Sequence, residues 1–157
     1  MTNSLKEGGL RKVVVLLRVL IGWHFLYEGI IKIYNPDWTA MGYLATAQGP
    51  LKSVFNALTQ DHFISWIDGI NMAALITVGL CFILGVFEKK AAIIAIGLLA
   101  MYYLAHPPFP GTYQVNVEGN YWFVNKNLIE LVACLVIYYL PTGSYFGIER
   151  LFVKNNS

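Results

Sequence analysis

The sequence contains little charge. Charged side chains make up 13% of its 157 residues, whereas a soluble domain usually carries roughly 25%. A water-soluble surface cannot be covered with so few charges, so we expect much of this surface to face lipid. The net charge is only +2, and no run of basic residues exceeds Lys89-Lys90. These features exclude a nucleic-acid-binding protein.

Cysteine is also scarce, and metal-binding motifs are missing. Cys81 and Cys134 each lie in an apolar run, and they form no Cys-x-x-Cys pair. This spacing matches neither a redox motif nor a zinc site, and we expect two buried, inert thiols. His62 and His106 could ligate a metal or haem, but single histidines near helix ends are usually ordinary. The sequence therefore predicts no metal site.

Long apolar runs, in contrast, dominate the chain. A spanning helix needs roughly 17–25 mostly apolar residues. Four segments of a single domain (residues 1–157) meet or approach this length: 13–33, 63–87, 89–106 and 124–140. The first run is longer than the apolar core of a signal peptide, which has about 7–15 residues, so we expect it to be retained. The prediction is an all-α fold, an integral membrane four-helix bundle.

The placement of Lys and Arg predicts the orientation of this bundle. Seven basic residues lie near the two termini and in the turn between the second and third helices: Lys6, Arg11, Lys12, Lys89, Lys90, Arg150 and Lys154. The opposite side has three: Lys32, Lys52 and Lys126. Because cytoplasmic loops carry an excess of Lys and Arg, we expect a multi-pass protein with both termini in the cytoplasm.

The two connections on the outer side are longer than the inner turn. In the first, Pro50 can start a short helix that lies in the membrane interface. The apolar face of that helix would hold Leu51, Val54, Phe55 and Leu58. In the second connection, from Pro107 to Tyr121, three prolines restrict the chain. We expect this second loop to pack on the bundle.

The first predicted helix carries several polar residues and two glycines. Five of its residues share one face at helical spacing: Arg18, Gly22, Phe25, Gly29 and Lys32. The glycines allow another helix to approach closely. Two interpretations stay open for the charges. Arg18 either snorkels to the near surface or faces a site, and Glu28 with Lys32 forms either an exposed pair or part of a site.

Polar residues from all four predicted helices gather at one depth, close to the outer surface. They are Glu28, Lys32, Asp68, Asn71, His106, Lys126, Asn127 and Glu130. Solvated helix ends would explain some of them, but Asp68 and Glu130 lie within apolar stretches, where a charge is costly. We therefore predict one connected polar cluster at this depth. Its expected members are Glu28, Lys32, Asp68, Asn71 and Glu130.

Three patterns resemble the DoxX family of membrane proteins. The spacing Arg18-x3-Gly22-x2-Phe25-x3-Gly29-x2-Lys32 resembles that family's opening motif. Asp68-x2-Asn71 followed by Gly79-x5-Gly85 resembles its second helix, and the run from Asn125 to Glu130 resembles the start of its fourth. The resemblance covers roughly residues 10–152. It implies a four-helix bundle in a bacterial cytoplasmic membrane, similar to the large membrane subunit of thiosulfate:quinone oxidoreductase.

The function that this resemblance implies is a membrane subunit of a quinone-linked oxidoreductase acting on a sulfur or thiol donor. A quinone would bind between the helices as the cofactor. The expected binding residues are Arg18, Lys32, Asn71, Asn127, Trp23 and Phe25. The expected catalytic residues, which would handle protons, are Glu28, Asp68 and Glu130.

The expected partners are the lipid bilayer, a small periplasmic or membrane subunit, and a second copy of the chain. Two alternative functions stay open. One is a non-catalytic scaffold or assembly subunit, in which the polar residues fix the register of the helices. The other is a carrier for a small solute, which would need an oligomer because four short helices form a pathway only together with other copies.

Overall fold

Helices form nearly all of the protein in its computed structural model, which describes residues 2–111 and 120–154, with side chains from 8–111 and 121–152. Within these ranges the long helices are α1 (Thr2–Tyr34), α4 (Asp61–Leu84), α5 (Glu88–Ala105) and α6 (Lys126–Tyr139). The short ones are α2 (Met41–Ala45), α3 (Lys52–Ala57), α7 (Gly143–Phe146) and α8 (Glu149–Lys154). Strands β1 (Asn120–Tyr121) and β2 (Val124–Asn125) form an antiparallel pair. The predicted all-α class is confirmed.

The predicted helix limits differ from the observed ones mainly at the first two helices. α1 begins well before residue 13, and α4 ends at Leu84 rather than at 87. The earlier end has a local cause. Gly85 adopts a left-handed conformation (φ 66°), and its backbone nitrogen donates to the Cys81 carbonyl, which terminates the helix. α5 and α6 lie within about two residues of their predicted limits.

Among the residues that the structure describes, two helices are long and apolar enough to cross a membrane. They are α1 over Gly8–Tyr34 and α4 over its full length, Asp61–Leu84. This agrees with the prediction of membrane-spanning helices for these two segments.

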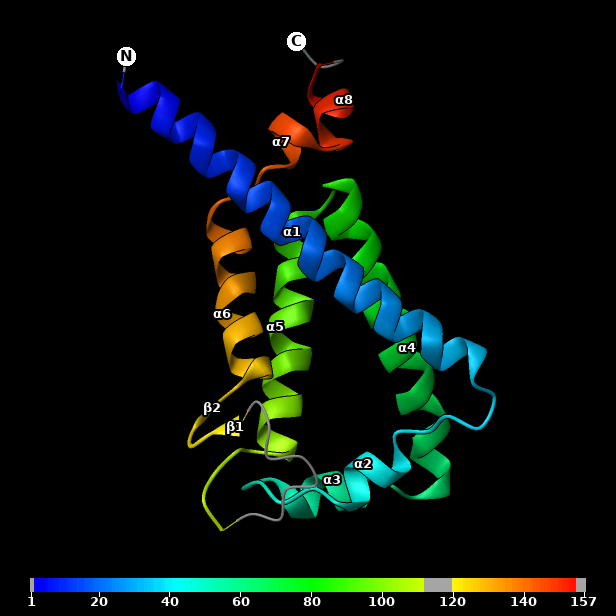
Figure 1. The fold of residues 1–157 in the computed structure, drawn as a ribbon. Helices are drawn as coiled ribbons and strands as arrows, with labels where there is room; N and C mark the ends of the chain where they lie inside the picture. Colours follow the sequence, from blue (N-terminus) through cyan, green and yellow to red (C-terminus); the bar gives the residue numbers. More distant parts are fainter. Residues whose placement is uncertain (1, 112–119, 155–157) are drawn as a thin grey trace.

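The long helices pack as two pairs, α1 with α4 and α5 with α6 (Figure 1). Glycines bring the first pair close together. A Cβ on Gly79 would lie 2.6 Å from the Leu26 backbone nitrogen, and a Cβ on Gly22 would lie 2.9 Å from the Phe82 Cβ. The predicted close approach at Gly22 and Gly29 is confirmed, since a Cβ on Gly29 would lie 2.7 Å from the Ile76 side chain.

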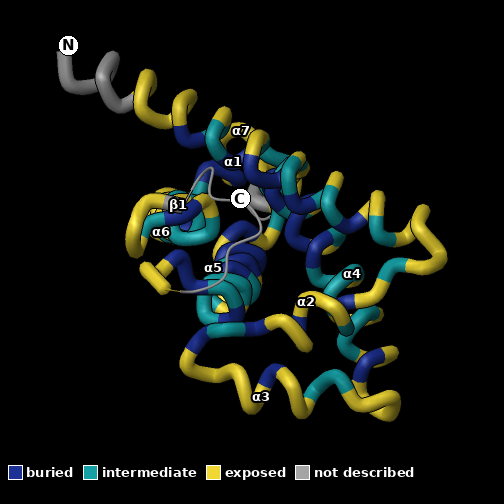
Figure 2. Tube along the Cα trace, turned by 60° about the horizontal axis from the view of Figure 1, so that its bottom comes forward, coloured by how far each residue is buried: buried dark blue, intermediate teal, exposed yellow. Residues whose placement is uncertain are grey.

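The two pairs meet along a common core. In Figure 2 the buried positions concentrate on α5 and on the faces that the other helices turn toward it, while exposed positions face outward. The most deeply buried apolar residues of this core are Val78, Phe82, Ala92, Ala95, Cys134 and Ile137. The buried Cys134 agrees with the expectation of an inert thiol, and Cys81 is partly buried.

A buried ion pair joins the two pairs of helices at one end, here called the Arg18 end. Arg18 Nη1 on α1 donates to Glu88 Oε1 on α5, and both residues are at most 2% exposed. Arg18 Nη1 also donates to Thr142 Oγ1 over 2.9 Å, and Arg18 Nη2 donates to the Phe146 carbonyl over 3.1 Å. Glu88 Oε2 accepts from the Thr142 backbone nitrogen over 2.7 Å. Helices α7 and α8 lie at this same end (Figure 1).

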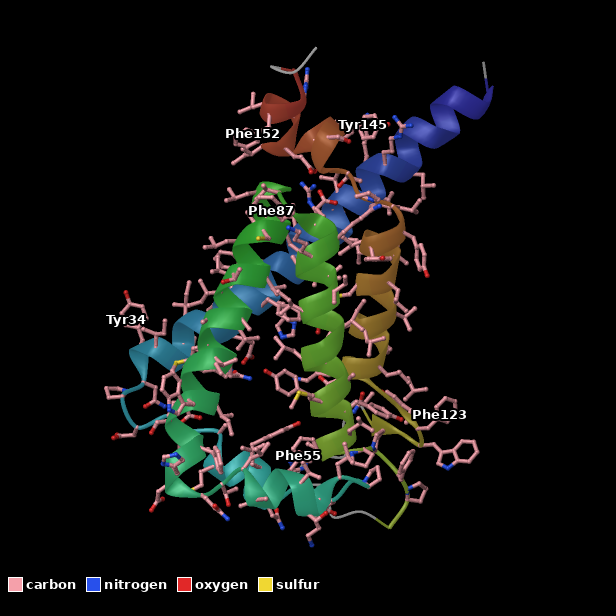
Figure 3. All side chains as sticks on the ribbon, turned by 180° about the vertical axis from the view of Figure 1, so that it is seen from behind. Tyr34, Phe55, Phe87, Phe123, Tyr145 and Phe152 are labelled. Carbon is pink, nitrogen blue, oxygen red and sulfur yellow. The ribbon has the colours of Figure 1, made fainter. Side chains whose placement is uncertain are left out.

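The opposite end, here called the cavity end, holds α2, α3 and the strand pair (Figure 1). The α2–α3 segment is fixed to the end of α5, because the backbone nitrogens of Gln48 and Gly49 both donate to the Ala105 carbonyl. The short helix predicted after Pro50 is observed as α3. Its Phe55 is buried against the bundle (Figure 3).

The loop from Pro107 to Tyr121 was predicted to pack on the bundle, but residues 112–119 lie outside the described residues. Near its start, Pro107 and Pro108 are buried. Just after its end, the Phe123 carbonyl accepts from the Tyr103 hydroxyl over 2.7 Å. These flanking contacts agree with the prediction without testing the middle of the loop.

A candidate ligand cavity at the wide end of the bundle

A cavity of about 310 Å³ lies at the cavity end, where the two pairs of helices diverge. Its apolar wall comes from Phe25, Leu75 and Leu99, which belong to three different helices. Its polar lining consists of His24, Glu28, Lys32, Asn71, Tyr102, Lys126 and Asn127. The α2–α3 segment and the turn before it close one side with Trp38, Thr39, Ala40 and Tyr43. Five of the residues predicted for the site therefore line one cavity: Phe25, Glu28, Lys32, Asn71 and Asn127.

Glu28 and Lys32 form an ion pair within α1, as their i,i+4 spacing allows. Lys32 Nζ donates to Glu28 Oε2 over 2.6 Å and to the Glu28 carbonyl over 3.2 Å. The Lys32 ammonium also lies 5.2 Å from the centre of the Trp38 ring, close enough for a cation–π contact. Both charges line the cavity, so the pair belongs to a site rather than only to an exposed helix end.

Glu130 finds a partner that the sequence analysis did not assign to it. Glu130 Oε1 on α6 lies 2.7 Å from His24 Nδ1 on α1, so the pair bridges the two helix pairs. The Glu130 side chain is 13% exposed. His24 lines the cavity. Sequence reasoning did not include His24 in the site, and the signal that could have found it is Glu130, a carboxylate at a matching level on the fourth helix that needs a partner.

Asn71 links α4 to α5 at the wall of the cavity. Its Nδ2 donates to the Tyr102 hydroxyl over 2.6 Å. The other amide atom, Oδ1, is buried and accepts from no residue in the described part of the chain. Next to this pair, the Tyr43 hydroxyl donates to the Tyr102 carbonyl over 3.0 Å. Burial raises the pKa of Tyr43, so its hydroxyl stays neutral and available as a donor throughout the physiological range.

Asp68 has a different position from the one expected of a catalytic residue. Its Oδ1 accepts from the Ala40 backbone nitrogen over 2.8 Å. The carboxylate therefore fixes the turn before α2 to α4, and Asp68 is not among the residues that line the cavity. We reassign it from a catalytic group to a positioning group for the α2–α3 segment.

Arg18 and Trp23 were expected to bind the ligand, and the structure places both elsewhere. Arg18 lies at the Arg18 end, where Glu88 and Thr142 engage it, because α1 crosses the bundle diagonally and reaches different partners along its length. Trp23 is 60% exposed and contacts the Tyr27 ring on the outer surface of α1. The expectation that these two residues line a shared site is wrong.

The prediction of one connected polar cluster is wrong, because its expected members form separate contacts and Asp68 does not line the cavity. The separate pairs are Glu28 with Lys32, Glu130 with His24, and Asn71 with Tyr102. Across residues 8–111 and 121–152, no three His, Cys, Asp or Glu side chains gather closely enough to hold a metal ion. The lining suits an organic ligand with an apolar body and several polar atoms at its edge.

No family model matches this chain, and neither a curated protein nor a solved structure matches it.

Proposed function

We propose that the chain is a multi-pass membrane protein in which α1, α4, α5 and α6 all span the bilayer, with both termini in the cytoplasm. Large apolar side chains point outward from all four helices and are more than half exposed: Leu20, Ile70, Ile93 and Val132. Such side chains are stable in lipid and costly in water. The exposed basic residues Arg11, Lys12, Lys89, Lys90 and Arg150 support a cytoplasmic Arg18 end.

Cysteine labelling in intact cells tests this topology. A membrane-impermeant reagent should modify a thiol introduced at Lys52, which is exposed at the cavity end, and should miss one at Lys89. A cysteine at Gly49, in the same segment, is unsuitable for labelling, because its Cβ would lie 1.6 Å from the Leu104 carbonyl oxygen. Modification of the cysteine at position 89 alone would mean that the orientation is the reverse of the proposed one. The unsubstituted chain is the control, because it measures the labelling of Cys81 and Cys134.

The function that the cavity supports best is that of a quinone-binding membrane subunit of an oxidoreductase that accepts electrons from a sulfur or thiol donor, as the resemblance to the DoxX family implies. The observation that carries this proposal is the cavity between the helix pairs. Its wall of Phe25, Leu75 and Leu99 suits a flat ring, and its edge offers cationic donors at Lys32 and Lys126 for ring oxygens.

The chain's own residues would bind the ring and hold protons at its edge. When bound, a quinone supplies an acceptor for two electrons and two protons, the electrons coming from two sulfur anions that join in one S–S bond. His24 lines the cavity, and Glu130 fixes one of its ring nitrogens. This pair can therefore keep a proton beside the ligand. Glu28 is the second carboxylate in the lining, held in place by Lys32.

The test is binding and reduction of a short-chain benzoquinone by the purified full chain in detergent, with and without thiosulfate, sulfide or a dithiol. Thr39 lines the cavity and is exposed, so Thr39→Trp should fill the cavity without disturbing the core. We expect this variant to lose quinone binding. Thr46→Trp is the matched control, because it also removes a local hydroxyl contact and lies on the same segment away from the cavity.

The outcomes separate the proposed function from its alternatives. Binding that Thr39→Trp abolishes and Thr46→Trp preserves supports the quinone site. Binding that neither change affects places the quinone elsewhere. A chain that binds no quinone in any form, yet is required for a partner subunit to accumulate in the membrane, is a scaffold rather than a redox subunit.

A further inference from the structure

We propose that the α7–α8 segment lies in the cytoplasmic leaflet of the bilayer and that the basic residues around it bind the head groups of anionic phospholipids. The inference rests on the membrane topology proposed above and does not depend on the quinone site. It assigns a partner to a surface at the Arg18 end, where exposed apolar side chains and exposed basic side chains occur together.

Backbone contacts fix this segment to the turn between α4 and α5. The Ile148 nitrogen donates to the Leu84 carbonyl over 2.9 Å, and the Glu149 nitrogen donates to the Gly85 carbonyl over 3.4 Å. Gly147 allows this close approach, because a Cβ there would lie 2.3 Å from the Gly85 carbonyl oxygen. The segment is therefore held against the end of the bundle, and its side chains cannot turn into the core without breaking these contacts.

Large apolar side chains point outward from the fixed segment. Leu151 and Phe152 lie three and four positions after Ile148, so the three share one helical face. Leu151 is 65% exposed and Phe152 is 63% exposed, and Phe87 in the turn between α4 and α5 is also exposed. Phe87 and Phe152 point away from the bundle (Figure 3). Such side chains are costly in water, whereas an amphipathic segment in the membrane interface buries them among acyl chains.

The charge around these apolar side chains is mostly positive. The exposed basic residues at this end are Arg11, Lys12, Lys89, Lys90 and Arg150. The carboxylates among the described side chains here are Glu88, which is paired with Arg18, and Glu149, which is only partly exposed. Basic residues near a membrane surface attract anionic lipids. A second copy of the chain would bring the same positive surface and be repelled, so lipid is the favoured occupant.

Two of these cations lie beside aromatic rings. The guanidinium carbon of Arg11 lies 4.2 Å from the centre of the Tyr145 ring, and the Lys90 ammonium lies 5.5 Å from the centre of the Phe87 ring. Both distances allow a cation–π contact. Each pair places a positive group at the edge of an apolar surface. A phospholipid matches this arrangement, because its phosphate can meet the cation while its acyl chains cover the ring.

The experiment measures which lipids surround the segment in the full chain reconstituted into phosphatidylcholine vesicles. A bimane fluorophore is attached to Leu151→Cys, and the unsubstituted chain gives the background from Cys81 and Cys134. A small fraction of nitroxide-labelled phosphatidylglycerol or phosphatidylcholine, with the nitroxide near the head group, is added as quencher. We expect the anionic lipid to quench about fivefold more strongly, the enrichment that one basic residue near the surface provides.

Two further measurements assign the preference to the basic residues. Lys89→Gln with Lys90→Gln should lower the preference to roughly half or less. Lys52→Gln is the matched control, because it removes an exposed lysine from the cavity end and should leave the preference unchanged. On the chain with all its basic residues, about 1 M salt should also reduce the preference, because it screens charges beyond roughly 3 Å. Equal quenching by the two lipids, or a preference that salt does not change, would overturn the inference.

A second probe separates this inference from the proposed topology. Ile93 on α5 is 59% exposed and lies on the outer surface of a proposed span. Bimane at Ile93→Cys should be quenched by both nitroxide lipids if α5 crosses the bilayer. Quenching at position 93 without quenching at position 151 would overturn the lipid contact of α7–α8 and keep the topology. Absence of quenching at both positions would overturn both proposals.

Discussion

The two ends of the bundle differ in how their charged side chains are buried and paired. At the Arg18 end, Arg18 and Glu88 are almost completely buried, and each contacts Thr142 as well as the other. At the cavity end, Glu28 and His24 are only partly buried, and both line the cavity. The first arrangement joins helices, and the second surrounds a space that a ligand can fill.

The difference between the ends follows from the tilt of α1. This helix crosses the bundle diagonally, so its early residues reach α5 and the segment after α6, while its late residues lie against α4 and leave room beside α5 (Figure 1). At the Arg18 end, the buried Arg18 Nε has no hydrogen-bond partner in the described part of the chain. The comparison predicts that changes at the Arg18 end affect folding and that changes at the cavity end affect binding.

Glu88→Gln should have the largest effect. It leaves the buried Arg18 guanidinium without its counter-charge, which costs about 3–5 kcal/mol when one partner of a buried pair is removed. We expect a strong loss of folded protein and a much lower Tm, measured by helical circular dichroism in detergent. The double variant Arg18→Met with Glu88→Leu should recover much of this loss, because apolar replacement of a whole buried pair is often tolerated. No recovery would mean that the hydrogen bonds to Thr142 matter more than the charges.

Gly79→Ala should have the next largest effect, because it pushes α4 away from α1, which rests on α4 in its tilted position. The added Cβ would lie 2.6 Å from the Leu26 backbone, and overpacking of this kind costs about 1–3 kcal/mol. Gly97→Ala is the control within a helix, since a Cβ there meets nothing within 4 Å. It should be neutral or stabilise the protein by up to about 1 kcal/mol. Equal Tm changes for both variants would contradict the close packing of α1 on α4.

Glu130→Gln should leave the amount of folded protein nearly unchanged and abolish quinone reduction. The amide still reaches His24, from which the carboxylate now lies 2.7 Å away, but it no longer provides a negative charge that stabilises a protonated imidazole. Quinone reduction and protein level are measured on the same membranes. A fall in folded protein with unchanged activity per molecule would show instead that the bridge between α1 and α6 is structural.

Glu28→Gln should have the smallest effect on stability. The Glu28 side chain is 38% exposed, and an i,i+4 ion pair on a helix contributes only about 0.2–0.5 kcal/mol. We expect a Tm close to that of the unsubstituted chain, measured beside Glu88→Gln in the same detergent. A fall in Tm as large as that caused by Glu88→Gln would contradict the view that charges at the cavity end contribute less to folding than those at the Arg18 end.

The long helices and the common level of several polar residues could be predicted from the sequence, because both depend on local patterns. The apolar runs gave the long helices, Pro50 indicated α3, and counting residues from the helix ends placed Glu28 and Asn71 at the same level. Gly22 and Gly29 indicated a close helix crossing without naming α4 as the partner.

The partners of the charges could not be predicted, because they depend on how the helices rotate and tilt. Arg18 and Glu88 are 70 residues apart, and nothing in the chain between them indicates that they meet. His24 and Glu130 are 106 residues apart, and the diagonal path of α1 brings them together. The short α2, α7 and α8 were missed because each is at most six residues long, too short to show a helical period.

The unequal lengths of the helices have a consequence for the surrounding lipid. In the proposed bilayer, the apolar part of α1, 27 residues long, extends about 40 Å at helical rise, whereas α6, with 14 residues, extends only about 21 Å. The hydrocarbon core of a bilayer is about 30 Å thick. The lipid must accommodate a helix that is too long on one side, which tilts, and one that is too short on the other, beside which the bilayer thins. Such a protein would deform its membrane asymmetrically, thinning the bilayer beside α6 and not beside α1.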